Sequence, residues 1–403
     1  MNRTVAVSLA VATLALAGCD MAAFAAGSTI KVFVRASPAI QRYRDPDLAE
    51  AAIPGSISQL EGVMSIKTED PDLRMLLGRS YGSYGYAFLE EHMEQAAITD
   101  DQVQVEYFRN RASMAYARGK EVTMEMMTLW EDEDGGAQGA HSRGIDSWKR
   151  YLLKFEDEEQ APILFWCAYN WARYIGVNRN QMDAVADLEF VRELANRVLQ
   201  LDRTYFSYAP VAMHAGLLAT LPAAVGGQPA VAKTEFEQVI NLTQRKNLLY
   251  IVTEAQLVAI ALQDRALYRT LLQEVIDADE NIDPANRLGN IIAKRRAVRW
   301  LARIDEFFEP VEGEAPAAQP RGNCNEPGAN ESFDDFNRRC TVMEGGGEAA
   351  PAPAPDPAPA AAAPAPAPAA PTAAPAVPAA APAAPTRPAR AARPAAAAPA
   401  TPR

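Results

Sequence analysis

The sequence predicts an all-α fold for the body of the chain, residues 46–309. Between Asp47 and about Phe308, apolar residues recur at spacings of three and four, and no stretch sustains the two-residue alternation that indicates a β-strand. The interruptions carry residues that begin or end helices. Connections between successive helices are short, so we expect antiparallel helices stacked in pairs, as a solenoid or bundle.

The first residues predict export and a lipid anchor. One cation, Arg3, precedes the apolar run Val5 to Leu16, which is the layout of a secretory signal peptide over residues 1–18. The run ends in Leu16-Ala17-Gly18-Cys19, which resembles the bacterial lipobox, so Cys19 is the expected site of lipid attachment. Ordinary cleavage after Ala25 is the alternative and would release a soluble exported protein. With the anchor, the protein would sit in the cell envelope facing the periplasm, in either membrane.

A linker over residues 19–45 is expected to lead into the helical body. Within the body, apolar stripes predict two helices particularly well, one with Leu188, Val191, Ala195, Val198 and Leu201 and the other with Leu267, Leu271 and Val275. An aspartate followed by proline marks a helix start at Asp70-Pro71 and at Asp283-Pro284, and Gly226-Gly227-Gln228-Pro229 ends one helix and begins another.

One stretch resembles a degenerate tetratricopeptide unit. His214-Ala215-Gly216 belongs to a first expected helix, and Ala232, Phe236 and Val239 on the next have the spacing with which such a repeat closes its helix pair. The turn is too long for a regular repeat, and no second copy follows at a fixed period. We therefore expect a cryptic tetratricopeptide-like solenoid or bundle and not a regular array.

The character of the chain changes after Glu309. Residues 310–343 are loop-rich, and Cys324 and Cys340 bracket a polar stretch, for which we expect a disulfide because the exported compartment permits one. Residues 344–403 are rich in alanine and proline, with 17 of the 30 prolines in the last 53 residues. Such a tail cannot bury a core, so we expect it to be disordered, either as a spacer or as a tether toward the cell wall or anionic lipid. The remaining cysteine, Cys167, lies in an apolar run and is expected to be buried.

Composition excludes several function classes. The formal net charge is −12, which disfavours a nucleic-acid partner. The chain has only three histidines, and His141 is expected at the surface, while His214 is expected in helix packing. The acidic run Glu131 to Asp134 precedes two glycines, but no register supplies the closing glutamate of a calcium loop, so no metal or other cofactor is expected. No nucleophile, phosphate-loop or dinucleotide motif is present, and we expect no enzymatic activity.

Aromatic residues interleaved with small ones are the most informative pattern. In the segment 78–90, glycines at 78, 82 and 85 share one helical face, which indicates either close approach of a neighbouring backbone or space beside the helix. Another face and a second segment carry aromatic side chains, which pack in the core or line an apolar channel; the candidate lining residues are Tyr81, Tyr84, Phe88, Trp166 and Tyr169.

At these residues the chain resembles the T-component family of tripartite ATP-independent periplasmic (TRAP) transporters. Tyr81 to Glu90 resembles the tyrosine-rich second helix of that family, and Asp70-Pro71-Asp72-Leu73 resembles the start of that helix. Further matches follow in family order over residues 46–280, among them Phe165-Trp166, the turn Leu199 to Asp202 and Lys246-Asn247-Leu248-Leu249. The alanine-proline tail and the acidic loop at 131–144 depart from the family pattern.

The resemblance implies a lipid-anchored helical protein that forms oligomers, trimers in the best-known case. Each protomer would carry an apolar pore and associate with a periplasmic solute-binding protein, the P-component. The implied function is accessory to TRAP-type solute import, through binding of an apolar ligand, of the solute-binding protein, or of both. The alternative is a helical-repeat interaction scaffold of an envelope complex with no small-molecule cargo.

Overall fold

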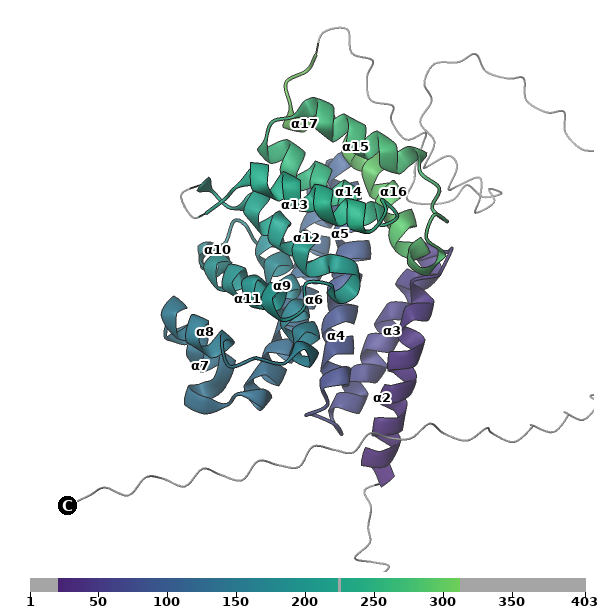
Figure 1. The fold of residues 1–403 in the computed structure, drawn as a ribbon. Helices are drawn as coiled ribbons and strands as arrows, with labels where there is room; N and C mark the ends of the chain where they lie inside the picture. The colour runs from purple at the N-terminus through teal and green to yellow at the C-terminus, as the bar shows by residue number, and fades with distance from the viewer. Residues whose placement is uncertain (1–20, 224–225, 312–403) are drawn as a thin grey trace, which may run out of the picture. The chain divides into compact units, whose positions relative to one another are not determined.

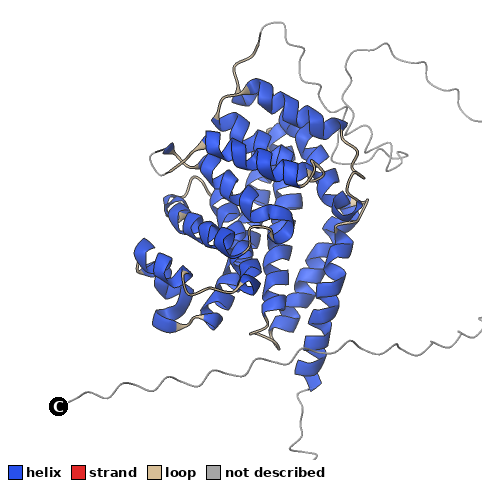
Figure 2. Ribbon diagram, in the orientation of Figure 1, coloured by secondary structure: helices blue, strands red, loops and turns tan. Residues whose placement is uncertain are grey.

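Helices make up the secondary structure of the part of the chain that the structure describes. The computed structural model describes residues 21–223 and 226–311 (Figure 1), and Figure 2 shows helices and connecting loops with no strand among them. The all-α prediction is confirmed for this part. The predictions for residues 1–18, Cys19, the Cys324–Cys340 disulfide and the tail 344–403 fall outside the described residues.

The helices fall into three consecutive groups, labelled as in Figure 1. The first group comprises α2 (Met21–Ile40), α3 (Pro46–Met64), α4 (Pro71–Tyr84), the π turn η1 (Gly85–Leu89), α5 (Glu90–Ile98) and α6 (Gln102–Trp130). The second comprises η2 (Glu133–Gly135), α7 (Gly136–Ser142), α8 (Ile145–Leu152), η3 (Glu158–Gln160), α9 (Ala161–Val177), α10 (Met182–Ala186) and α11 (Leu188–Leu201). The third comprises α12 (Tyr205–Thr220), α13 (Pro229–Leu242), α14 (Leu248–Glu254), the π turn η5 (Ala255–Ala259), α15 (Arg265–Asp277), η6 (Pro284–Asn286), α16 (Arg287–Leu301) and α17 (Ile304–Phe307).

The expected helix starts are confirmed. Asp70 caps α4, where its Oδ1 accepts a hydrogen bond from the Leu73 amide at 3.0 Å and Pro71 is the first helical residue. Asp283 caps the short helix η6 in the same way, through the Ala285 amide. Pro229 begins α13, directly after the glycine break. The two apolar stripes are the buried faces of α11 and α15.

A helix occupies most of the segment 19–45, which we expected to be a linker. Ala26 and Ile30 of α2 are buried, and Phe33 and Val34 pack against the same core of the first group. Their spacing of three or four residues is that of an amphipathic helix, and alanines at the start of the segment favour helix formation. Packing of this apolar side on α3 and α4 stabilises a helix where we expected a linker.

The helix pair predicted from the repeat-like motif forms in the third group. α12 packs along α13, and Ala232, Phe236 and Val239 are completely buried between them. His214 pairs through Nδ1 with Glu235 Oε2 at 2.7 Å, which agrees with the expected role in helix packing. Its relation to tetratricopeptide repeats stays a prediction.

Three helices of the first two groups meet at a seam of glycines, formed by Gly78 and Gly82 of α4 and Gly119 of α6 around Asn170 of α9. A Cβ atom on Gly78 would lie 2.5 Å from Thr123 Cγ2, and one on Gly119 would lie 2.5 Å from Asn170 Oδ1. Asn170 Nδ2 donates to the carbonyl oxygens of Gly78 at 2.9 Å and of Trp166 at 2.7 Å. The glycines therefore serve close approach of helices, and the alternative of open space beside the helix does not hold at this seam.

Substitution of Gly119 by alanine should destabilise the protein, because the added methyl group displaces the Asn170 amide in a fully packed contact. We expect a loss of about 1–3 kcal/mol in the free energy of unfolding. A Cβ atom on Gly55, in the middle of α3, would meet no described atom within 4 Å, so Gly55→Ala should instead stabilise by up to about 1 kcal/mol. Urea denaturation followed by circular dichroism measures the free energy of unfolding of both variants. Equal changes in the two would contradict the close packing of helices at the glycine seam.

Candidate functional site

The first three candidate lining residues lie together in the core of the first helix group. Tyr81 OH donates to Glu61 Oε1 of α3 at 2.8 Å, and Arg111 Nη2 of α6 donates to Tyr84 OH at 3.1 Å. Phe88 is buried, with its ring centroid 6.0 Å from that of Tyr84. These side chains are therefore fixed between α4, α3 and α6.

The other two candidates, Trp166 and Tyr169, belong to an aromatic wall that also contains Phe165, Tyr205 and Phe206. The ring centroids of Trp166 and Tyr169 are 5.4 Å apart, and that of Phe206 is 5.7 Å from Trp166. Trp166 Nε1 donates to Tyr205 OH at 3.0 Å, which joins α9 to the start of α12. Sequence analysis did not select Tyr205 and Phe206, because they follow a turn and lie 39 or more residues from Trp166.

The five candidates thus form two groups on different faces of α4. A Cβ atom on Gly82 would lie 3.1 Å from Tyr169 Cδ1, so the aromatic wall meets α4 on its glycine face. Tyr81 and Tyr84 leave the same helix toward α3 and α6. The sequence placed the candidates in two segments but did not show that the two groups contact different neighbouring helices.

Tyr169 and Arg173, one turn apart on α9, keep accessible surface in a largely protein environment. Burial raises the pKa of the Tyr169 phenol, yet its side chain is only half-buried. The Arg173 side chain is 30% exposed, while its Nε donates to Glu90 Oε1 at 3.0 Å. Side chains that touch solvent while mostly surrounded by protein are expected at the wall of a cleft.

A buried charge cluster ties the first helix group to the last. It consists of Glu90, Glu91 and Glu94 at the start of α5, Arg173 of α9, and Arg296 and Arg299 of α16. Arg296 Nη2 lies 3.0 Å from Glu94 Oε1, and Arg299 Nη1 lies 2.9 Å from Glu91 Oε1. Three negative and three positive side chains balance in number, which is the condition under which charges are tolerated in an interior.

The arginines determine the ionisation of Glu94. Burial opposes ionisation of Glu94, but the neighbouring Arg296 and Arg299 outweigh it, so the pKa of Glu94 lies below its ordinary value. The π turn η1 comes directly before these glutamates, and its Tyr86 ring lies 4.0 Å from the Arg296 guanidinium. The sequence alone could not identify arginines 80 or more residues away as the partners of these glutamates.

The histidine interpretation needs one correction. His141, which we expected at the surface, is half-buried; its Nε2 lies 2.9 Å from Asp187 Oδ1, and its ring packs against Phe190 at 4.3 Å between centroids. Trp171 Nε1 donates to the other carboxylate oxygen of Asp187. Partners 46 and 49 residues later in the chain hold this histidine, and a glycine-rich context alone does not reveal them.

Neither the acidic loop at 131–144 nor the free cysteine forms a reactive or metal-binding site among the described residues. Glu133 pairs with Lys154 at 2.6 Å. Within residues 21–223 and 226–311, no three Asp, Glu, His or Cys side chains come together in an arrangement that would hold a metal ion. Cys167 is completely buried, as predicted, and burial raises the pKa of its thiol to about 12, which makes it a poor nucleophile.

Glu254 is a buried acid that sequence analysis missed. It is 2% exposed at the end of α14, immediately before the π turn η5, and its carboxylate has no hydrogen bond to any described residue. Burial, aided by the negative charge of Glu237, raises its pKa to about 7, while Lys233 and Arg245 act in the opposite direction. A single glutamate in an otherwise helical pattern gives no signal of such an environment.

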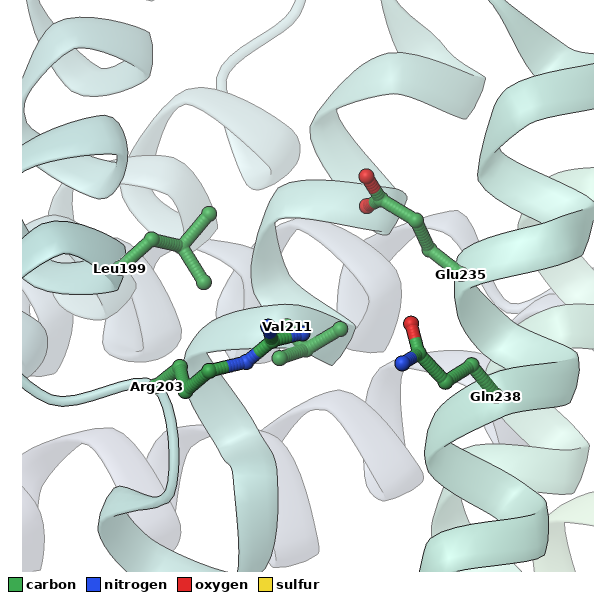
Figure 3. A pocket seen from close by; sticks show the side chains of 5 residues that line it. All are labelled: Leu199, Arg203, Val211, Glu235 and Gln238. Carbon is green, nitrogen blue, oxygen red and sulfur yellow. The ribbon is translucent and has the colours of Figure 1, made fainter.

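Two pockets open on the third helix group. The smaller one, of about 200 Å³, is drawn in Figure 3, where Arg203 from the turn before α12 extends toward Glu235 and Gln238 of α13, with Leu199 and Val211 beside them. The larger one, of about 360 Å³, lies among Gln41, residues 206–208, residues 242–247 and residues 283–286, and we call it the amide pocket for the side chains described below. Neither was predicted, because each collects residues from three or more distant segments.

Removal of one charge from the buried cluster should cost more than removal of an exposed charge. Glu94→Gln leaves Arg296 and Arg299 without part of their compensation, and we expect a loss of about 3–5 kcal/mol in the free energy of unfolding. Glu121, which pairs with Arg118 and is 56% exposed, provides the control, and Glu121→Gln should change stability by less than about 1 kcal/mol. Chemical denaturation at neutral pH compares the two; similar losses would rule out a special role for burial.

Glu254 should make stability depend on pH. Its folded-state pKa of about 7 exceeds the ordinary value of 4.5, so between these pH values the unfolded chain ionises first and stability falls as pH rises. Glu254→Gln should therefore be more stable than the wild type by about 2 kcal/mol at pH 8 and equally stable at pH 4. Urea midpoints of both proteins across this range test it, with the exposed Glu69→Gln as a control that should show no such trend.

Comparison with known proteins gives the family. No helix in the described ranges combines the length and the apolar character needed to cross a bilayer. No curated protein matches the sequence. A family model described as TRAP transporter T-component matches residues 42–308, which include α3 to α16 and every candidate lining residue. This match covers more than half of the sequence, and the chain belongs to the TRAP transporter T-component family.

Proposed function

We propose that this protein is an envelope lipoprotein accessory to TRAP-type solute import, which holds an apolar ligand in its helical body and associates with the periplasmic solute-binding component. Family membership supports the transport context. Cys19 would carry the lipid that keeps the protein at the membrane, on the periplasmic side. Association into trimers is part of the same proposal, because the family resemblance implies it.

The aromatic wall is the observation that carries the ligand-binding part of the proposal. Five rings from α9 and α12 adjoin one another, Tyr169 keeps accessible surface, and Phe206 is 39% exposed where it borders the amide pocket. Aromatic rings offer a large apolar contact area at little cost in side-chain entropy. A wall of this kind, reached from a pocket, suits an elongated apolar molecule better than a small polar one.

The candidate lining residues contribute unequally. Tyr169, which keeps accessible surface, would contact the ligand directly, and Trp166, which is 3% exposed, would support the wall from the interior. Tyr81, Tyr84 and Phe88 would form a second apolar lining on the opposite face of α4, where hydrogen bonds to Glu61 and Arg111 hold the two tyrosines in position. No covalent step is required in either place, since the protein would only shelter and release its cargo.

One observation supports partner binding, which is required both for the transport function and for the alternative of an interaction scaffold without cargo. On α6, Val103, Tyr107 and Met114 share one helical face and are 76%, 53% and 65% exposed. Exposed apolar side chains on a single face are typical of a surface that binds another protein. This stripe serves partner binding in both proposals, so the ligand test decides between them.

The two functions separate in a binding experiment with the neutral fluorophore N-phenyl-1-naphthylamine. The purified full chain should bind it saturably, and Trp166→Ala or Phe206→Ala should weaken binding about tenfold, because each removes a large ring from the wall. Tyr107→Ala removes an exposed ring on α6 and should leave the affinity for the fluorophore unchanged.

Absence of saturable binding by the wild type, together with no lipid recovered by extraction of the purified protein, would refute the cargo function. A solute-binding protein that still co-purifies under those conditions, and is lost with Tyr107→Ala, would establish the scaffold in its place.

A further inference from the structure

We propose that the amide pocket binds the anionic head of a single-chain amphiphile whose apolar chain extends along the aromatic wall. This inference rests on the proposed binding of an apolar ligand and adds the chemical class of that ligand, an alkyl chain that ends in a carboxylate or phosphate. Three observations support the inference: the size of the pocket, its polar side chains, and its connection to the aromatic wall through Phe206.

The pocket is large enough for a head group and the first part of a chain. Its volume is about 360 Å³, and its lining comes from the end of α2, the start of α12, the connection from α13 to α14, and η6. The convergence of four segments gives polar groups on several sides of one space, which is the usual construction of a ligand site.

The polar lining combines one cationic side chain with several side-chain amides. Lys246 contributes an ammonium group that forms no ion pair with any described residue. Asn286 Nδ2 donates to Asn247 Oδ1 at 3.3 Å, so the remaining polar group of Asn247 is its NH₂. Gln41 and Gln244 add two more side-chain amides.

The acidic residue of the pocket, Asp283, forms no ion pair with Lys246 and is engaged at the start of η6. Asp283 Oδ1 accepts a hydrogen bond from the Ala285 amide at 3.0 Å, as the cap of η6, so part of its acceptor capacity is already used. An ammonium group and amide NH₂ groups that line one pocket can together satisfy the oxygens of a carboxylate or phosphate through charge-assisted hydrogen bonds. The same groups offer little to a neutral apolar ligand.

An unusual backbone turn connects the pocket to the aromatic wall. Phe206, Ser207 and Tyr208 have φ values of 47°, 59° and 66°, in the left-handed region that non-glycine residues rarely adopt. Tyr250 OH donates to the Ser207 carbonyl at 2.8 Å and holds the turn. In this conformation Phe206 borders the pocket and also contacts Trp166, with Arg79 4.7 Å from its ring centroid. An amphiphile with its head near Lys246 would therefore have its first methylenes at Phe206.

Competition against N-phenyl-1-naphthylamine tests the inference with three probes, dodecanoate, dodecanol and butyrate. Dodecanoate should bind the wild type at least tenfold more tightly than dodecanol or butyrate, because it alone has both chain and charge. Lys246→Gln should weaken dodecanoate about tenfold and leave dodecanol unchanged, and Lys246→Arg should restore most of the loss. Phe206→Ala should weaken dodecanoate and dodecanol alike.

Lys67→Gln serves as the matched control, since Lys67 also lacks an ion pair with the described residues but lies outside the pocket. If dodecanol binds the wild type and Lys246→Gln leaves the affinity for dodecanoate unchanged, the inference is overturned. Butyrate binding as tightly as dodecanoate would also overturn it and would indicate a site for small free carboxylates. If neither dodecanoate nor dodecanol competes in the wild type, the proposed binding of an apolar ligand is refuted as well. Failure of the head-group inference can thus be distinguished from failure of the proposed function.

Discussion

The contact of three helices around Asn170 is the constraint on which the rest of this structure depends. Glycines on α4 and α6 let the backbones approach, and the Asn170 amide donates a hydrogen bond to the Gly78 carbonyl oxygen of α4. Because α9 is held in this way, its other residues take fixed places. Trp166 and Tyr169 join the aromatic wall, and Arg173 reaches Glu90. Packing and the candidate site therefore share one helix and one set of contacts.

The buried charges complement this seam at long range. Glycine contacts join helices within the first half of the chain, whereas Arg296 and Arg299 bring α16 onto α5 across some 200 residues. Apolar packing alone would allow α16 to slide along or rotate on its neighbour. Paired charges in a low-dielectric interior tolerate little displacement, so they favour a single arrangement of the two halves.

Much of the fold was predictable because it depends on local signals. Apolar spacing and capping residues such as Asp70 and Pro229 identified helices correctly, since both act within one or two turns. The segment 21–40 was taken for a linker although Ala26 and Ile30 already carry a helical period. The site was less predictable. Phe206, Glu254 and the environment of His141 depend on partners far along the sequence, and only the folded chain brings these together.

The two π turns have a consequence for how this sequence can change. Each accommodates one residue more than a regular helical turn, and each adjoins a buried acid, Glu90 after η1 and Glu254 before η5. Loss of one residue between Gly85 and Leu89 would let a regular α-helical turn replace the π turn, because about four residues of an α-helix and about five of a π turn each complete one turn. Glu91 and Glu94 would then still face their arginines. The two π turns are therefore the points in these helices at which the loss of one residue disturbs the neighbouring contacts least, whereas a deletion within α5 or α14 would rotate the residues that follow by about 100°.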